Sequence, residues 1–219
     1  MTRILSKEVL EVLGEYVARD VAAGFLLPDE IIQSATDALE GEGDSAAMHI
    51  EATRLCGEAI AAHLAAQSTW PSVTDCDKLD RAFAELESMG IVARQNYSCC
   101  GTCGAAEIVD EMESAVDKGG AVEGYTFFHA QDAESAAEGH GLYLSYGSAE
   151  RSEDSTLTVG HKIVATLGKY GLVPAWGWQF EQADCRAAGL EATARSRAVT
   201  IRSADAASRR SLVQGQGHS

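Results

Sequence analysis

The chain has 219 residues and a mass of 23.1 kDa, enough for one large domain or two small ones with a core of their own. Hydrophobic residues make up 46% and charged residues 23%, which excludes a wholly disordered chain, a collagen-like repeat and a disulfide-dense miniprotein. Lys and Arg total 17 against 33 Asp and Glu, and the resulting net charge of -16 argues against nucleic acid and anionic membranes as partners.

The beginning of the chain lacks the pattern of a secretory signal. Residues 1–13 alternate charged and apolar side chains, without a basic segment followed by a continuous apolar stretch. The longest apolar stretch, Val21–Leu27, is interrupted by Gly24 and is too short to span a bilayer. We therefore expect a cytoplasmic protein whose six cysteines stay reduced.

Helical spacing of apolar residues predicts three helices in the first third of the chain: Lys7–Ala23, Asp29–Leu39 and Ser45–Ala66. Pro28 suits the start of the second helix. The apolar stripe of the third is predicted to contain Ile50, Cys56, Ile60 and Leu64. We expect residues 1–66 to form a helical N-terminal unit that packs against the rest of the chain.

Helices and strands are predicted to alternate over residues 74–180. A helix with a capping box at Thr74 and Asp77 is expected first. The expected strands are Ile91–Tyr97, Tyr125–Phe128, Leu142–Tyr146 and Leu172–Trp176, and the further helices are Ala105–Val116, Gln131–Ala137 and Val159–Lys169. This order predicts an α/β fold, with α+β as the alternative, built on a small sheet of about four strands flanked by helices.

Residues 181–219 differ in composition from the rest. They contain six Arg, no Lys and no aromatic residue, so they carry a positive charge while the first 180 residues are acidic. We expect a poorly packed tail rich in Arg, Ala and Ser, and residues from about Ala204 onward to be dispensable for folding.

The most informative segment is Ser98-Cys99-Cys100-Gly101-Thr102-Cys103-Gly104, between a predicted strand and a predicted helix. A thiol at a helix N-terminus is stabilised as thiolate, so Cys100 and Cys103 are candidates for a redox pair with Cys100 as the nucleophile. The order of strand, C-x-x-C and helix matches the thioredoxin arrangement. Thioredoxin-like folds also place a proline-bearing loop beside the motif, and this chain has no proline between Pro71 and Pro174.

Two other interpretations of the same cysteines stay open. Thiolates suit zinc, and Cys99 or Cys100 with Cys103 offers two ligands that Cys76 and either His129 or His140 would complete. The four-ligand pattern of a zinc ribbon is missing. Alternatively the three cysteines are small side chains that pack where the strand turns into the helix.

His129 follows a predicted strand and is the candidate for acid–base chemistry. If that strand is parallel to the one before the cysteines, His129 lies at the same edge of the sheet as the cysteine turn. The connection from this strand to Leu142 is short, which favours an antiparallel pairing of those two strands. The alternative role for His129 is structural, with Asp132 as its partner in a helix cap.

Four segments together resemble an uncharacterised bacterial family, domain of unknown function 6891: GIVARQNYSCCGTCGAAEI (90–108), GYTFFHAQD (124–132), GLYLSYG (141–147) and VGHKIVATLGKYGLVPAW (159–176). The resemblance covers roughly residues 70–178 and implies no reaction. It also implies a further strand rich in basic and aromatic residues after Trp176, whereas this chain continues with Ala, Arg and Ser from Gln179 onward.

Two functions compete. The first is an acidic binding or regulatory module without catalysis, with another protein as its partner, because the sequence contains no complete catalytic motif. The second is a thiol-redox or zinc-binding protein that uses Cys99, Cys100 and Cys103. The sequence leaves open whether the chain is an enzyme and which oligomeric state it adopts.

Overall fold

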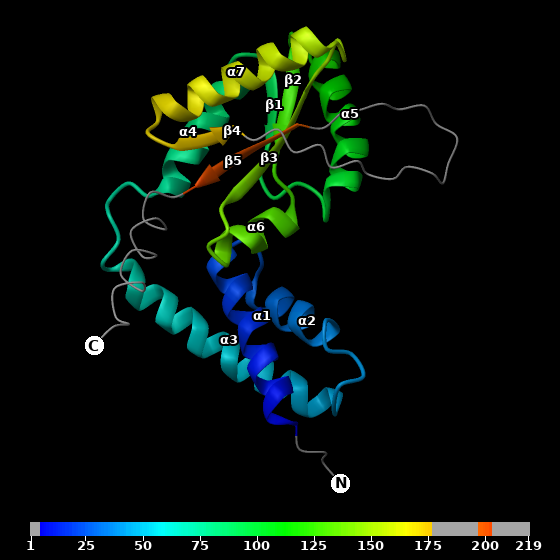
Figure 1. Cartoon of the computed structure of the whole chain (residues 1–219). Helices are drawn as coiled ribbons and strands as arrows, with labels where there is room; N and C mark the ends of the chain where they lie inside the picture. Colours follow the sequence, from blue (N-terminus) through cyan, green and yellow to red (C-terminus); the bar gives the residue numbers. More distant parts are fainter. Residues whose placement is uncertain (1–4, 177–196, 203–219) are drawn as a thin grey trace, which may run out of the picture. The chain divides into compact units, whose positions relative to one another are not determined.

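The computed structural model describes residues 5–176 and 197–202, which form two compact units that meet in the sequence between Ser72 and Val73 (Figure 1). None of the helices in these ranges combines the length and apolar composition that a membrane-spanning helix needs. The predicted α/β fold with a helical N-terminal unit is confirmed.

The first unit consists of three helices: α1 (Lys7–Ala23), α2 (Pro28–Asp37) and α3 (Ser45–Gln67). The side chains of Ser6 and Asp44 cap the N-termini of α1 and α3, and Gly24 ends α1 in the left-handed conformation. The three helices share one core of buried side chains: Leu13, Val17, Val21, Ile31, Ile32, Ala35, Leu39, Met48, Ala52 and Cys56.

The predicted apolar stripe of α3 is wrong at two positions. Ile50 is 70% exposed and Leu64 is 58% exposed, whereas Met48, Ala52 and Cys56 form the buried face. Ile50 comes two residues after Met48, about 200° further round the helix. Leu64 lies eight residues past Cys56, about 80° away from that face.

The second unit contains four helices and five strands within the described ranges. Its helices are α4 (Asp75–Ser88), α5 (Gly101–Asp117), α6 (Ala130–Ala137) and α7 (Glu153–Lys169). Its strands are β1 (Ile91–Arg94), β2 (Gly124–Phe127), β3 (Leu142–Ser148), β4 (Val173–Trp176) and β5 (Arg197–Arg202).

The strands form one mixed sheet in the order β1-β2-β3-β5-β4. β1 and β2 are parallel, and β2 and β3 are antiparallel, as the short connection predicts. β5 is inserted between β3 and β4 and is antiparallel to both. The described residues thus form five strands where the sequence predicts about four, because Arg197–Arg202, within the segment predicted to be a poorly packed tail, forms a strand. Residues 181–196 and 203–219 lie outside the described residues, so the rest of the tail stays a prediction.

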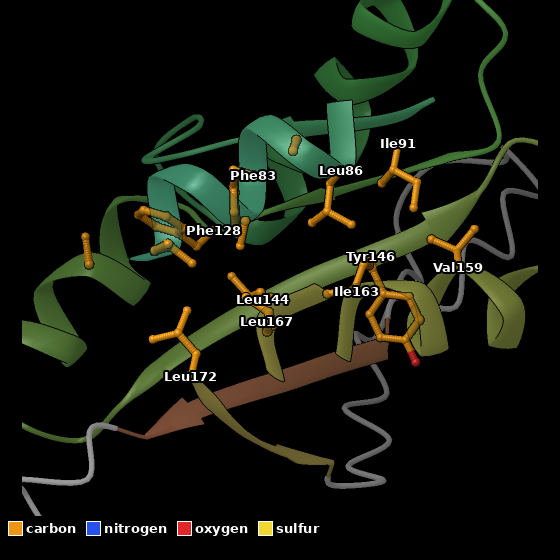
Figure 2. Close-up of a cluster of buried hydrophobic side chains, with 14 residues drawn as sticks. Phe83, Leu86, Ile91, Phe128, Leu144, Tyr146, Val159, Ile163, Leu167 and Leu172 are labelled. Carbon is orange, nitrogen blue, oxygen red and sulfur yellow. The ribbon is translucent and has the colours of Figure 1, made fainter. Parts of the chain in front are cut away.

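Helices cover both faces of this sheet, as its alternating side chains show. Ile91 and Ala93 face the core formed with α4 and α7, while Val92 faces the core formed with α5. Figure 2 shows the first core, in which Leu86 of α4 and Ile163 of α7 lie close to Leu144 of β3. The second core contains Val92, Ile108, Met112, Tyr125 and Phe127.

Two predicted boundaries around the cysteines are wrong. The first strand ends at Arg94 instead of Tyr97, because Asn96 and Ser98 adopt left-handed backbone angles that an extended strand cannot contain. The following helix begins at Gly101 instead of about Ala105. Cys103 therefore lies in the first turn of α5, Cys100 is its N-cap residue, and Cys99 directly precedes the cap.

Candidate thiol site

A short loop joins β1 to α5 and is fixed to the segment after β2. The amide of Tyr97 donates to the carbonyl of Phe128 at 2.8 Å, and the amide of Ala130 donates to the carbonyl of Ser98 at 3.2 Å. These hydrogen bonds help to hold Ser98 in its left-handed conformation (φ 64), which costs an ordinary residue roughly 1–2 kcal/mol. Since β1 and β2 are parallel, this loop and the start of α6 lie at the same edge of the sheet, as expected.

Cys100 and Cys103 occupy the N-terminal end of α5. Cys100 is the N-cap residue in an extended conformation, and its carbonyl accepts the amide of Gly104 at 2.9 Å. Gly104 lets this end approach β2, because a Cβ there would lie 2.6 Å from the ring of Phe127. The fully buried Phe127 ring thereby fixes the distance of the first turn from the sheet.

The structure brings three thiols together. The sulfur atoms of Cys99, Cys100 and Cys103 all lie within 4.8 Å of one another, and we call these three residues the thiol cluster. Cys99 is exposed, and Cys100 and Cys103 are partly exposed. The exposed Cys99 does not fit the packing interpretation, which stays open for the partly buried Cys100 and Cys103.

The environment separates the acidities of Cys100 and Cys103. The backbone amide of Cys103 is the largest cause that lowers the pKa of Cys100, followed by the thiol of Cys103. Hydrogen bonds with Cys99 and Cys100, followed by the negative charge of these two neighbours, raise the pKa of Cys103 to about 11. Cys100 is therefore the more acidic of the two thiols and loses its proton before Cys103 as the pH rises.

His129 lies beside the cluster as the N-cap residue of α6. Its Nδ1 accepts the amide of Asp132 at 3.3 Å, while its Nε2 lies 3.1 Å from Oδ2 of the same residue. Asp132 Oδ2 also accepts the amide of His129, which completes the predicted helix cap. The imidazole borders the cysteine turn, since a Cβ on Gly101 would lie 3.4 Å from Nε2. A role for His129 in catalysis stays a prediction.

Asp132 is largely buried, and this desolvation raises its pKa. The hydrogen bond and the positive charge offered by His129 oppose the shift. The two ring nitrogens of His129 thus face the backbone amide and the carboxylate of Asp132, and the pair caps the N-terminus of α6.

The other predicted metal ligands do not join the cluster. Cys76 is exposed on α4, where burial of the sulfur and the neighbouring carboxylates of Asp80, Asp77 and Asp75 raise its pKa. His140 is exposed after α6, with Nδ1 3.6 Å from a carboxylate oxygen of Glu138. Among the described residues, the only metal-ligand group of three or more His, Cys, Asp or Glu side chains is Cys99, Cys100 and Cys103.

The sequence groups Cys99 with Cys100 and Cys103, but it does not show that Gly104 is required for the approach of α5 to β2. The spacing shows Cys100 and Cys103 as a pair, whereas the position of Cys99 depends on the left-handed residues Asn96 and Ser98. The one indication in the sequence is Gly104, directly after Cys103, because a glycine in a helix allows its backbone to approach a neighbouring element closely.

Comparison with protein families shows that the chain belongs to the family described as a domain of unknown function, DUF6891, whose model matches residues 6–183. The match includes the helical unit, the thiol cluster and the sheet up to β4. Comparison with curated proteins and with solved structures gives no significant match. The family assigns no reaction, so the chemistry has to be argued from the cluster itself.

Proposed function

We propose that the thiol cluster is a thiol–disulfide redox centre, with Cys100 as the nucleophile and Cys103 as its partner. The observation that carries this proposal is the approach of the sulfur atoms to within 4.8 Å at the first turn of α5. Residues one helical turn apart have a Cα separation near the roughly 5.5 Å that a disulfide requires. The unpaired amides of a helix N-terminus stabilise the thiolate that begins such a reaction.

The reaction balances as a two-electron exchange with a disulfide substrate. The Cys100 thiolate attacks one sulfur of the substrate, its disulfide breaks, and the leaving substrate thiolate takes up a proton. Cys103 then loses its proton and attacks the Cys100 sulfur, which forms the Cys100–Cys103 disulfide and releases the second substrate thiol. Two electrons pass from the protein to the substrate.

The high pKa of Cys103 suits the second place in this sequence. Part of the shift to about 11 comes from the negative charge of Cys100. That charge disappears when Cys100 enters the mixed disulfide, so the proton of Cys103 becomes easier to remove at this step. The net charge of -16 favours a substrate protein with a basic surface around its disulfide.

Metal binding by the same thiols is the second candidate, favoured by the convergence of three sulfur ligands. Zinc, the ion expected from the sequence, takes four ligands in structural sites. Within the part of the chain that the structure describes, the group offers three. A zinc ion here would need water or another molecule as its fourth ligand.

The test counts thiols, metal and disulfides in the freshly purified full chain. After reduction, the protein is equilibrated in a glutathione buffer poised at about -180 mV, the free thiols are alkylated, and the peptides are analysed by mass spectrometry. We expect a Cys100–Cys103 disulfide in the wild type and in the control Cys76→Ser. In Cys103→Ser we expect a glutathione adduct on Cys100 instead.

Each other outcome rejects the redox proposal. Stoichiometric metal with no disulfide would select the metal site. Free thiols and no metal would leave the remaining expectation, a binding module without catalysis.

A further inference from the structure

The third thiol influences the pKa values of the other two but forms no bond in the proposed redox step. Cys100 and Cys103 complete that exchange, yet Cys99 contributes a sulfur within 4.8 Å of both. Cys99 is exposed, so packing does not explain its position next to the other two. The convergence of all three needs a function to which each sulfur contributes.

The donor set is uniform and soft. It contains three sulfur atoms and, among the described residues, no imidazole nitrogen or carboxylate oxygen within the same group. His129 is the nearest candidate nitrogen ligand, but both of its ring nitrogens face Asp132. Cys76 lies on α4 outside the group. Thiolates select Cu(I) and zinc over harder ions, whereas tetrahedral coordination by four sulfur or nitrogen atoms is the arrangement typical of zinc.

We infer that Cys99, Cys100 and Cys103 bind one soft monovalent cation of the Cu(I) class through three thiolates. The metal keeps its oxidation state, each thiol that binds releases its proton, and three new metal–sulfur bonds form. One cation on three thiolates leaves a charge of about -2, and the positive end of α5, equivalent to about +0.5 charge, offsets part of it. This site does not depend on the proposed redox step.

The test is an anaerobic titration of the fully reduced full chain with Cu(I), in competition with a chromophoric Cu(I) chelator. We expect one tightly bound Cu(I) per chain. Cys99→Ser should weaken that binding by at least about 100-fold, because loss of a residue that only supports a metal ligand already costs up to about 100-fold in affinity. The matched control Cys76→Ser, also an exposed cysteine outside the group, should change the affinity by less than about 2-fold.

Two results would overturn the inference: a Cys99→Ser variant that binds Cu(I) as tightly as the wild type, or Zn(II) that displaces bound Cu(I) at equal concentration. Circular dichroism of each variant verifies that it is folded. The redox proposal is tested independently, because Cys99→Ser retains Cys100 and Cys103 and should still form their disulfide. A wild-type chain that forms the disulfide but binds no Cu(I) rejects the metal site alone, and one that binds Cu(I) but forms no disulfide rejects the redox step alone.

Discussion

Cys100 and Cys76 carry the same functional group in opposite surroundings. At the start of α5, the backbone amide of Cys103 lowers the pKa of Cys100. At the start of α4, burial and three nearby aspartates raise the pKa of Cys76. Both residues stand at a helix N-terminus, so position relative to the helix does not by itself activate a thiol. At Cys76, burial of the sulfur, followed by the neighbouring carboxylates, outweighs the backbone hydrogen bond that lowers its pKa.

This contrast predicts the pH dependence of alkylation in the reduced protein. The thiolate is the reactive form, so the rate for Cys100 should reach half of its maximum at a lower pH than the rate for Cys76. At pH 7 Cys100 should therefore react faster with iodoacetamide, as peptide mass spectrometry after timed quenching will show. The difference should vanish in concentrated urea, where both surroundings are lost. Equal half-maximal pH values in the folded protein would contradict the prediction.

Among the structural elements, α4 shows how local chemistry alone determines a helix start. The sequence predicts a capping box at Thr74 and Asp77, and the structure confirms it. The amide of Asp77 donates to Thr74 Oγ1 at 3.2 Å, and the amide of Thr74 donates to Asp77 Oδ2 at 2.7 Å. The hydroxyl of Thr74 donates to Asp77 Oδ2 at 2.7 Å, and this hydrogen bond, followed by that of the Thr74 amide, lowers the pKa of Asp77.

Thr74→Ala should reduce the stability of the protein at neutral pH by about 1 kcal/mol, as the loss of a helix cap typically does. The loss should shrink as the pH falls through the lowered pKa of Asp77, because that carboxylate contributes only when ionised. Urea unfolding at neutral and acid pH measures both effects. The control Thr158→Ala, at an exposed position within α7, should stay within about 0.5 kcal/mol of the wild type. Equal losses in the two variants would show that the cap is not the cause.

The start of α5 was harder to predict than that of α4. Its first turn contains Gly101 and Gly104, which have low helix propensity, so the helical pattern becomes visible only at Ala105. Tertiary contacts decide instead, since Gly104 is required by the ring of Phe127. The pairing of Cys100 with Cys103 could therefore be predicted from spacing, but the place of Cys103 in the first turn of α5 could not.

At the scale of the whole molecule, the sheet of the second unit depends on a segment that the sequence assigns to the tail. β5 contains the β-branched residues Val199, Thr200 and Ile201, a pattern typical of strands. Its flanking residues are rich in Ala, Arg and Ser, so these few β-branched residues do not by themselves predict a strand. The sequence predicts β4 but not the partner that attaches it, because strand pairing is a property of the fold and not of the local sequence.

This topology predicts opposite results for two truncations. A chain that ends after Trp176 loses β5, so the edge of β3 is uncovered and β4 has no partner strand. The lost ladder hydrogen bonds, each worth about 0.5–1.5 kcal/mol, should together cost at least about 3 kcal/mol. That loss should lower the melting temperature by roughly 6–12 °C in a protein of this size.

A chain that ends after Ser203 keeps β5 and should melt within about 2 °C of the full chain. The segment that it lacks has Leu212 and Val213 as its only large apolar residues, too few to offset roughly 1–2 kcal/mol of backbone ordering per residue. Scanning calorimetry of the three chains measures both effects. If the chain that ends after Trp176 melted like the full chain, the pairing of β5 with β3 and β4 would contribute nothing to stability. If the chain that ends after Ser203 melted far below the full chain, the residues after Ser203 would contribute to the fold.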